Sequence, residues 1–79
     1  MSTTAERFRT LRNASGLTQV QLAERLGVTQ GMVSQIEAGR LDPAAEVMVG
    51  YCLKMNWPLA EVIGSERADR LRAALDLAN

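Results

Sequence analysis

Apolar residues recur every three or four positions along most of the chain, which is the spacing of amphipathic helices rather than of strands. Glycine or proline interrupts this pattern at intervals and divides the chain into short segments. The pattern predicts a single all-α domain of five or six helices, with no strand, internal repeat or linker. We expect helices over about residues 3–14, 18–27, 29–39, 42–56, 59–63 and 66–78.

The segment from Leu17 to Arg40 carries the clearest pattern. Thr18 is a good N-cap, and Gln21 three residues later completes a capping box. Gly27 is expected to end this helix, because glycine adopts the left-handed conformation of a C′ residue without a Cβ penalty. The expected apolar face of the helix comprises Val20, Leu22, Ala23 and Leu26.

A second short helix is expected between Thr29, as its N-cap, and Gly39. Val33 and Ile36 lie three residues apart and are expected to face the core. The outer side of this helix then carries Gln30, Gly31, Ser34 and Gln35. Two short helices joined by a tight turn form a helix-turn-helix, the arrangement that places its second helix in the major groove of DNA.

The flanking segments predict the rest of the core. The buried stripe of the first helix is expected to comprise Ala5, Phe8 and Leu11. Asp42 is expected to cap a fourth helix that has Pro43 in its first turn, and Ser65 is expected to cap the last helix. The apolar stripe of the fourth helix comprises Val47, Met48, Tyr51, Cys52 and Met55.

The last helix bears on assembly, because its apolar residues form one stripe: Ala68, Leu71, Leu75 and Ala78. This stripe either covers the core of its own domain or docks on a second copy of the chain in a two-fold dimer, and the sequence leaves both alternatives open. We expect a dimer, because one recognition helix reads too few base pairs to be selective. Within a domain spanning residues 1–79, the expected dimerisation region is 57–79, with an interface of Trp57, Leu59, Leu71 and Leu75.

The charge distribution qualifies the DNA-binding interpretation. The 79 residues have a formal net charge of zero, and the sequence pI of about 6.2 argues mildly against a nucleic-acid binder. Residues 1–40, however, carry five Arg and three Glu, whereas residues 41–79 carry four basic and six acidic residues. The positive half contains the predicted helix-turn-helix, so we expect few phosphate contacts and a weak salt dependence of DNA binding.

The composition argues against an enzyme. The chain has no histidine and a single cysteine, Cys52, so it lacks an imidazole base, a His-based metal site and an internal disulfide. We expect Cys52 to be a buried core residue, and we expect no metal and no cofactor. The sequence has neither an apolar run long enough to span a membrane nor a signal-peptide pattern, so we expect a cytoplasmic protein.

The motif residues are Thr18-Gln19, Leu22-Ala23, Leu26-Gly27-Val28-Thr29-Gln30, Val33-Ser34 and Ile36-Glu37-Ala38-Gly39-Arg40. This pattern resembles the lambda/434 repressor and Cro (XRE-like) family of helix-turn-helix regulators, which includes phage repressors and the controller proteins of restriction-modification systems. The similarity extends upstream to Phe8 and, more weakly, downstream to about Gly64. It implies a lambda-repressor-like DNA-binding domain and a bacterial or phage-encoded protein.

The resemblance also implies which residues meet DNA. The residues expected to contact bases are Thr29, Gln30, Gly31, Ser34 and Gln35. The residues expected to contact phosphates are Thr18, Gln19, Met32 and Arg40. Gln19 is further implied to buttress Gln30, and Arg12 is implied to form a partly buried structural ion pair with Glu37. Relatives often carry a longer residue in place of Gly31, so either the helix backbone approaches DNA closely there or this position reads nothing.

The sequence therefore predicts a transcriptional regulator that binds a pseudo-palindromic operator as a homodimer. Phage repressors and restriction-modification controllers fit this pattern equally, and activation would require contact with RNA polymerase, for which Glu24 is the evident candidate. The alternative is an antitoxin or adaptor that uses the same fold to bind a protein. The short polar side chains on the outer side of the third helix favour DNA.

Overall fold

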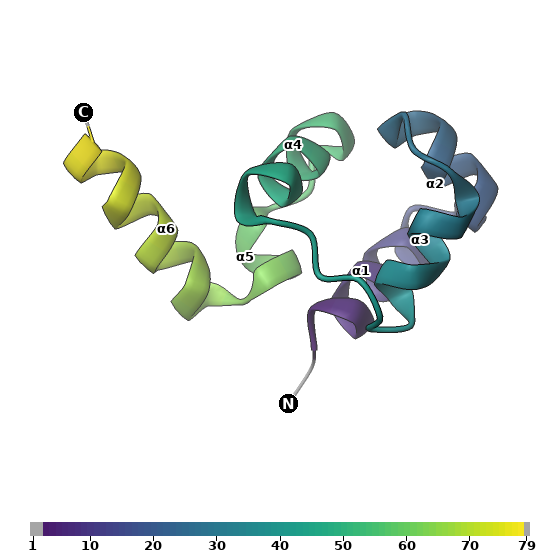
Figure 1. The fold of residues 1–79 in the computed structure, drawn as a ribbon, viewed down its shortest axis with the longest axis horizontal. Helices are drawn as coiled ribbons and strands as arrows, with labels where there is room; N and C mark the ends of the chain where they lie inside the picture. The colour runs from purple at the N-terminus through teal and green to yellow at the C-terminus, as the bar shows by residue number, and fades with distance from the viewer. Residues whose placement is uncertain (1–2, 79) are drawn as a thin grey trace.

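The computed structural model describes the backbone of residues 3–78 and the side chains of residues 3–76, which form six helices and no strand. The helices are α1 (Thr4–Ala14), α2 (Gln19–Leu26), α3 (Gln30–Glu37), α4 (Ala45–Met55), α5 (Leu59–Ile63) and α6 (Ser65–Ala78). α1 packs against α3 and α5, α2 packs against α3 and α4, and α4 packs against α5. α6 contacts α5 at its start and then extends away from the other helices (Figure 1). The predicted all-α fold is confirmed, and none of the described helices has the length and hydropathy needed to cross a membrane.

The ends of α2 and α3 follow from local capping. The Thr18 hydroxyl accepts a hydrogen bond from the Gln21 amide at 3.1 Å, and the Gln21 side-chain oxygen accepts one from the Thr18 amide at 2.9 Å. The Thr29 hydroxyl likewise accepts a hydrogen bond from the Met32 amide at 3.1 Å. Gly27 ends α2 with a φ of 73°, a left-handed conformation that few residues other than glycine adopt. The expected capping box and C-terminal glycine are therefore present.

An aromatic cluster lies at the centre of the core. The ring of Phe8 packs edge-on against Trp57 at a centroid distance of 5.6 Å and lies 6.5 Å from the ring of Tyr51. The Trp57 indole donates a hydrogen bond to the Ser15 hydroxyl at 3.2 Å. Trp57 is only 9% exposed, so the expectation that it lines a dimer interface is corrected: its side chain belongs to the core of its own domain. The remaining buried apolar residues are Leu22, Ala23, Leu26, Val33, Ile36, Met48, Cys52, Val62, Ile63 and Ala68.

The fourth helix begins later than predicted. Asp42 and Pro43 precede α4, which starts at Ala45, and its N-cap residue, Ala44, makes no side-chain capping hydrogen bond. Pro43 is buried in the extended connection between α3 and α4. The expectation that Asp42 caps this helix is therefore wrong, because burial of Pro43 keeps the chain extended where a local signal favours a helix start.

Two apolar residues expected on buried faces are exposed: Val20 is 53% exposed and Val47 is 40% exposed. The buried residues of α2 are Leu22, Ala23 and Leu26, and the sector is centred on Leu22 and Leu26, so Val20 lies beyond its edge on the side of Ala23. Val20 therefore points away from the core. An apolar side chain alone does not show where the centre of the buried sector of a helix lies, because other helices determine which side is covered.

The last helix begins on the core and then leaves it. α6 starts at Ser65 itself, so Ser65 is not its N-cap, and the Gly64 carbonyl accepts a hydrogen bond from the Ala68 amide at 3.0 Å. Ala68 is fully buried and Leu71 packs against the core, whereas Leu75 is 54% exposed. Ala78, the last residue of the predicted stripe, has a side chain outside the described part of the chain. The stripe thus covers its own domain only at its N-terminal end.

Candidate nucleic-acid interface

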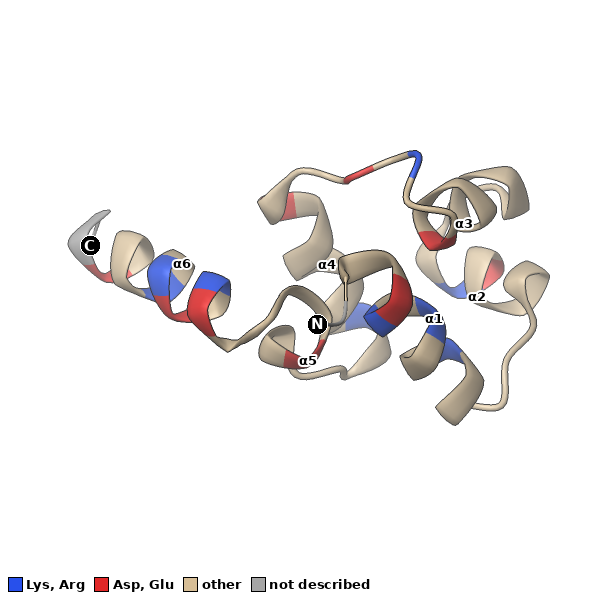
Figure 2. Cartoon of the chain, turned by 90° about the horizontal axis from the view of Figure 1, so that it is seen from below, with Lys and Arg blue, Asp and Glu red and all other residues tan. Residues whose placement is uncertain are grey.

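The outer face of α3 is polar and uncharged, and the only charged residue of the helix, Glu37, is buried at its end. Gln30, Gly31 and Gln35 are exposed, and Ser34 is half-buried. On the inner face, Val33 and Ile36 are buried against the core. The sequence of α3 contains one acidic residue and no basic one, as the colouring in Figure 2 illustrates. A helix with this outer face presents hydrogen-bond donors and acceptors without long charged side chains in front of them.

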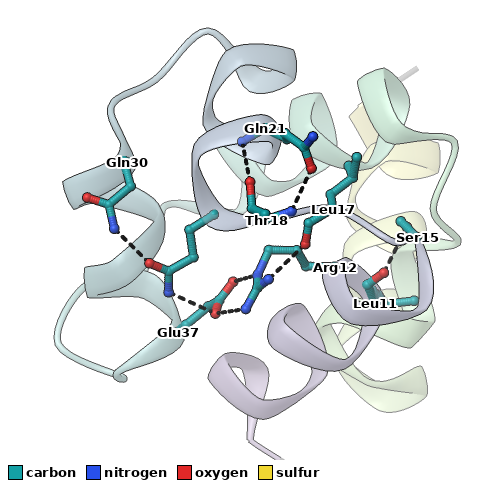
Figure 3. A network of polar contacts seen from close by, with 9 residues as sticks. Leu11, Arg12, Ser15, Leu17, Thr18, Gln21, Gln30 and Glu37 are labelled. Atoms are coloured by element: carbon teal, nitrogen blue, oxygen red, sulfur yellow. Dashed lines mark hydrogen bonds and ion pairs between the residues drawn. The ribbon is translucent and has the colours of Figure 1, made fainter.

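An ion pair connects α1 to the end of α3 (Figure 3). The Arg12 guanidinium donates two hydrogen bonds to the Glu37 carboxylate, at 2.6 and 2.9 Å, and a third to the Leu17 carbonyl at 2.8 Å. The Arg12 and Glu37 side chains are only 13% and 4% exposed. The hydrogen bond to Glu37 raises the pKa of Arg12, an effect that exceeds the opposing effect of burial. The pair expected from the resemblance is therefore present as a bidentate, largely buried contact.

The same carboxylate determines the orientation of two glutamine side chains. Glu37 accepts a further hydrogen bond from the Gln19 amide nitrogen at 3.2 Å, and the Gln19 amide oxygen accepts one from the Gln30 amide nitrogen at 2.7 Å (Figure 3). A carboxylate only accepts, so it directs the NH₂ group of Gln19 inward and leaves the Gln19 oxygen for Gln30. The amide of Gln30 is consequently held with its oxygen and its second N–H free.

The other residues predicted at DNA fall into two groups. Thr18 and Thr29 are exposed and use their hydroxyls as helix caps, and Arg40 is exposed just beyond α3. Met32 is 36% exposed, and its sulfur accepts a hydrogen bond from the Tyr51 hydroxyl at 3.6 Å. Thr18, Thr29 and Arg40 are thus accessible to a ligand. The Met32 side chain is less accessible, because part of it packs against Tyr51 in α4.

Sequence reasoning missed two contacts between distant segments. Lys54 donates a hydrogen bond from Nζ to the Leu26 carbonyl at 3.1 Å and so satisfies a carbonyl at the C-terminus of α2. The contact between Gln19 and Glu37, which links the ion pair to α2, was also not anticipated. The position of Lys54 near the end of its helix is only a weak signal for this contact, because the partner, Leu26, lies 28 positions away in the sequence.

Cys52 is the single cysteine of the chain and lies in the core. Burial raises the pKa of the Cys52 thiol, which disfavours the reactive thiolate. Within the described part of the chain, no three His, Cys, Asp or Glu side chains lie close enough together to hold a metal ion. The start of α3 and the N-terminus of α2 together carry exposed polar groups that hydrogen bonds orient, Gln30 and Thr18 among them.

A comparison with protein families assigns the region around α2 and α3 to a known type of domain. A family model described as a helix-turn-helix domain matches residues 5–53, which is more than half of the chain. The matched segment begins in α1, contains α2 and α3, and ends in α4. No curated protein and no solved structure matches the chain.

Proposed function

Because the chain belongs to the helix-turn-helix domain family, a family typically of DNA-binding rather than catalytic domains, we propose that it is a sequence-specific transcriptional regulator of the Cro-like type. In this proposal α3 enters the major groove of operator DNA. A regulator of this type acts in the cytoplasm of a bacterial cell. The observation that carries the proposal is the orientation of the Gln30 amide, which Gln19 and Glu37 hold from behind.

Held in this way, Gln30 has the hydrogen-bonding groups that adenine requires. Its free oxygen can accept a hydrogen bond from adenine N6, and its second N–H can donate to N7. Ser34 and Gln35 lie one turn further along α3 and reach neighbouring bases, with Thr29 at the helix start. These side chains supply the direct readout of the operator.

Phosphate contacts position α3 in the groove. The first amides of α2 and the Thr18 and Gln19 side chains lie together at a helix N-terminus, which suits an anion, and Arg40 provides a positive charge beyond α3. Met32 adds an apolar contact with the sugar-phosphate backbone. Few of these groups are charged, so binding depends less on salt than it does for strongly basic proteins.

We further propose a homodimer, so that two copies of α3 read the two halves of a pseudo-palindromic operator. The interface lies within residues 57–79 and includes Leu59, Leu71 and Leu75. Leu75 is 54% exposed on the part of α6 that leaves the core, and an exposed leucine on an extending helix gains most from a partner. Trp57 is not included, since it is buried within one chain.

Replacement of Leu75 by aspartate should therefore shift the protein from dimer to monomer. The domain itself should keep its stability, because this side chain is exposed in the single chain. Sedimentation velocity over a range of concentrations measures the change, and thermal unfolding at the lowest concentration checks the fold. An unchanged dimer would remove Leu75 from the interface, and a protein that is monomeric without any substitution would overturn the dimer.

Operator binding represses when the dimer excludes RNA polymerase from the promoter. Activation would instead require contact with polymerase, and Glu24 is exposed on α2 and available for such a contact. Transcription from a promoter that carries the operator, measured with and without the protein, distinguishes the two.

Selection of bound duplexes from a random pool, at about physiological salt, tests the function directly. We expect a pseudo-palindromic site that contains adenine, and we expect Gln30→Ala to weaken binding to it by about 1–3 kcal/mol, which is roughly 5- to 150-fold. Asn13→Ala, which removes an exposed amide on α1, serves as the control and should leave affinity unchanged. Failure to enrich any site would favour the antitoxin or adaptor alternative.

A further inference from the structure

An uncharged hollow lies along α4 and the turn that leads into α5. Its lining residues are Val49, Cys52, Leu53, Asn56, Trp57 and Leu59. Leu53 is 78% exposed, the highest value among the exposed large apolar side chains of the described residues. A single exposed leucine is ordinary on a protein surface, but a leucine that continues into an apolar hollow marks a contact surface.

The size and chemistry of this hollow suit side chains of another helix better than a small molecule. Its volume is about 210 Å³. Pockets for drug-sized ligands are larger, roughly 300–1,000 Å³, and contain several polar groups that converge on the ligand. The Trp57 indole N–H is already bonded to Ser15, which leaves the Asn56 amide and the Cys52 thiol as the polar side-chain groups of the lining. The hollow therefore fits one or two apolar side chains.

α6 carries apolar side chains that its own chain leaves uncovered. Leu75 is 54% exposed, and Leu71, one turn earlier, is only half-buried against the core. α6 packs on α5 at its start and then runs away from α4 (Figures 1 and 2). Each chain thus presents two separate apolar surfaces, the hollow on α4 and the stripe on α6.

The two surfaces match in spacing and in charge. The open side of α4 carries an acidic residue and then two apolar residues, spaced three or four positions apart: Glu46, Val49 and Leu53. The stripe of α6 has a basic residue and then two leucines, spaced four positions apart: Arg67, Leu71 and Leu75. Two such helices that lie side by side in the same direction bring leucines together at one end and opposite charges together at the other.

We infer that α6 of each chain lies in the hollow of a second copy, with Leu75 of one chain against Leu53 of the other. This inference rests on the proposed homodimer and extends its interface from residues 57–79 into α4. Leu59 lines the hollow and is also part of the interface proposed above, so the two surfaces are continuous.

Two-fold symmetry makes this contact reciprocal, because each chain contributes one helix and receives one. A stable interface buries roughly 1,200–2,000 Å² in total, which is more than a pair of isolated leucines supplies. Two helices that each lie along a partner bring whole helix faces together, and the hollow filled by the partner's helix is then removed from water.

Replacement of Leu53 by aspartate tests the surface on α4. Leu53→Asp should raise the dissociation constant of the dimer on the order of tenfold or more, because the change occurs at both contacts. The melting temperature of the monomer should not change, since this side chain is exposed in the single chain. Val20→Asp, the same kind of change at a 53% exposed residue of α2, should leave the dimer intact. Sedimentation velocity of the full chain measures both variants.

A mixing experiment tests which residues meet. Leu53→Asp and Leu75→Lys should each be monomeric alone, because both contacts of either dimer are damaged. An equal mixture should recover a dimer, in which one contact is unaltered and the other pairs aspartate with lysine. A purely structural effect of either substitution would not be reversed by mixing. A mixture that stays monomeric would overturn the inference.

The other outcomes are also decisive. If the parent protein is monomeric, the proposed homodimer fails, and the inference fails with it. If the parent protein is dimeric and only Leu75→Asp dissociates it, the homodimer stands, and the inference that α6 lies in the hollow is overturned. Equal dissociation by Val20→Asp and Leu53→Asp would also overturn the inference, because the loss would then not depend on the hollow.

Discussion

Replacement of Arg12 by methionine should lower the free energy of unfolding by about 3–5 kcal/mol, because it leaves a charge without its partner inside the protein. The Glu37 side chain is only 4% exposed, and after the substitution its carboxylate would keep a single hydrogen bond, from Gln19. For a domain of this size the melting temperature should fall by more than about 10 °C. Thermal and denaturant unfolding monitored by circular dichroism measure the loss.

Arg72→Met provides a matched control. Arg72 forms the other ion pair of the described residues, with Asp69 at 3.5 Å, and these side chains are 57% and 75% exposed. Solvent screens this pair, so its loss should change stability by less than about 1 kcal/mol. Similar losses for Arg12→Met and Arg72→Met would contradict a special role for burial. Arg12→Met combined with Glu37→Leu should recover part of the stability, because no unpaired charge then remains.

Gly64→Ala should produce the second large effect. Gly64 joins α5 to α6 with a φ of 91° and a ψ of 151°, a region that is essentially restricted to glycine. A side chain there is strained by about 1–3 kcal/mol. Its Cβ would also overlap the Arg7 guanidinium, but this group ends a flexible side chain and can move aside at little cost. We therefore expect a lower denaturation midpoint and a displaced α6, which would also weaken the proposed dimer.

Two comparisons separate the causes of this loss. In an Arg7→Ala background the overlap is absent and only the backbone strain remains, so Gly64→Ala should destabilise by nearly the same amount as in the parent protein. Gly50→Ala, the same chemical change at an open helical position, should have the opposite sign. A Gly64→Ala protein as stable as the parent would mean that the link between α5 and α6 adopts another conformation.

Features that depend on near neighbours in the chain were predictable. The capping box at Thr18 and the cap at Thr29 join groups three residues apart, and the turn at Gly27 depends on one residue that tolerates a positive φ. The start of α4 was not predictable in this way. Asp42 and Pro43 carry a strong local signal for a helix start, but burial of Pro43 overrides it.

Burial and long-range pairing were the features that local patterns could not decide. Val20 and Trp57 are both apolar, yet one is exposed and the other packs on Phe8, because the outcome depends on which elements meet them in space. The link from Glu37 through Gln19 to Gln30 joins positions 18 and 11 apart. The resemblance implied its two ends, the ion pair and the support of Gln30, but not the connection between them.

The sequence by itself therefore determined the presence of the helices, the caps of α2 and α3, the helix-turn-helix and the polar outer face of α3, because backbone hydrogen bonds and helical periodicity act over three or four residues. Only the tertiary structure decided that one buried carboxylate orients the glutamine at the start of α3, that Trp57 belongs to the core, and that α6 leaves the core after Leu71. The physical reason is that burial and hydrogen-bond direction depend on atoms from distant segments, and these meet only when the chain has folded.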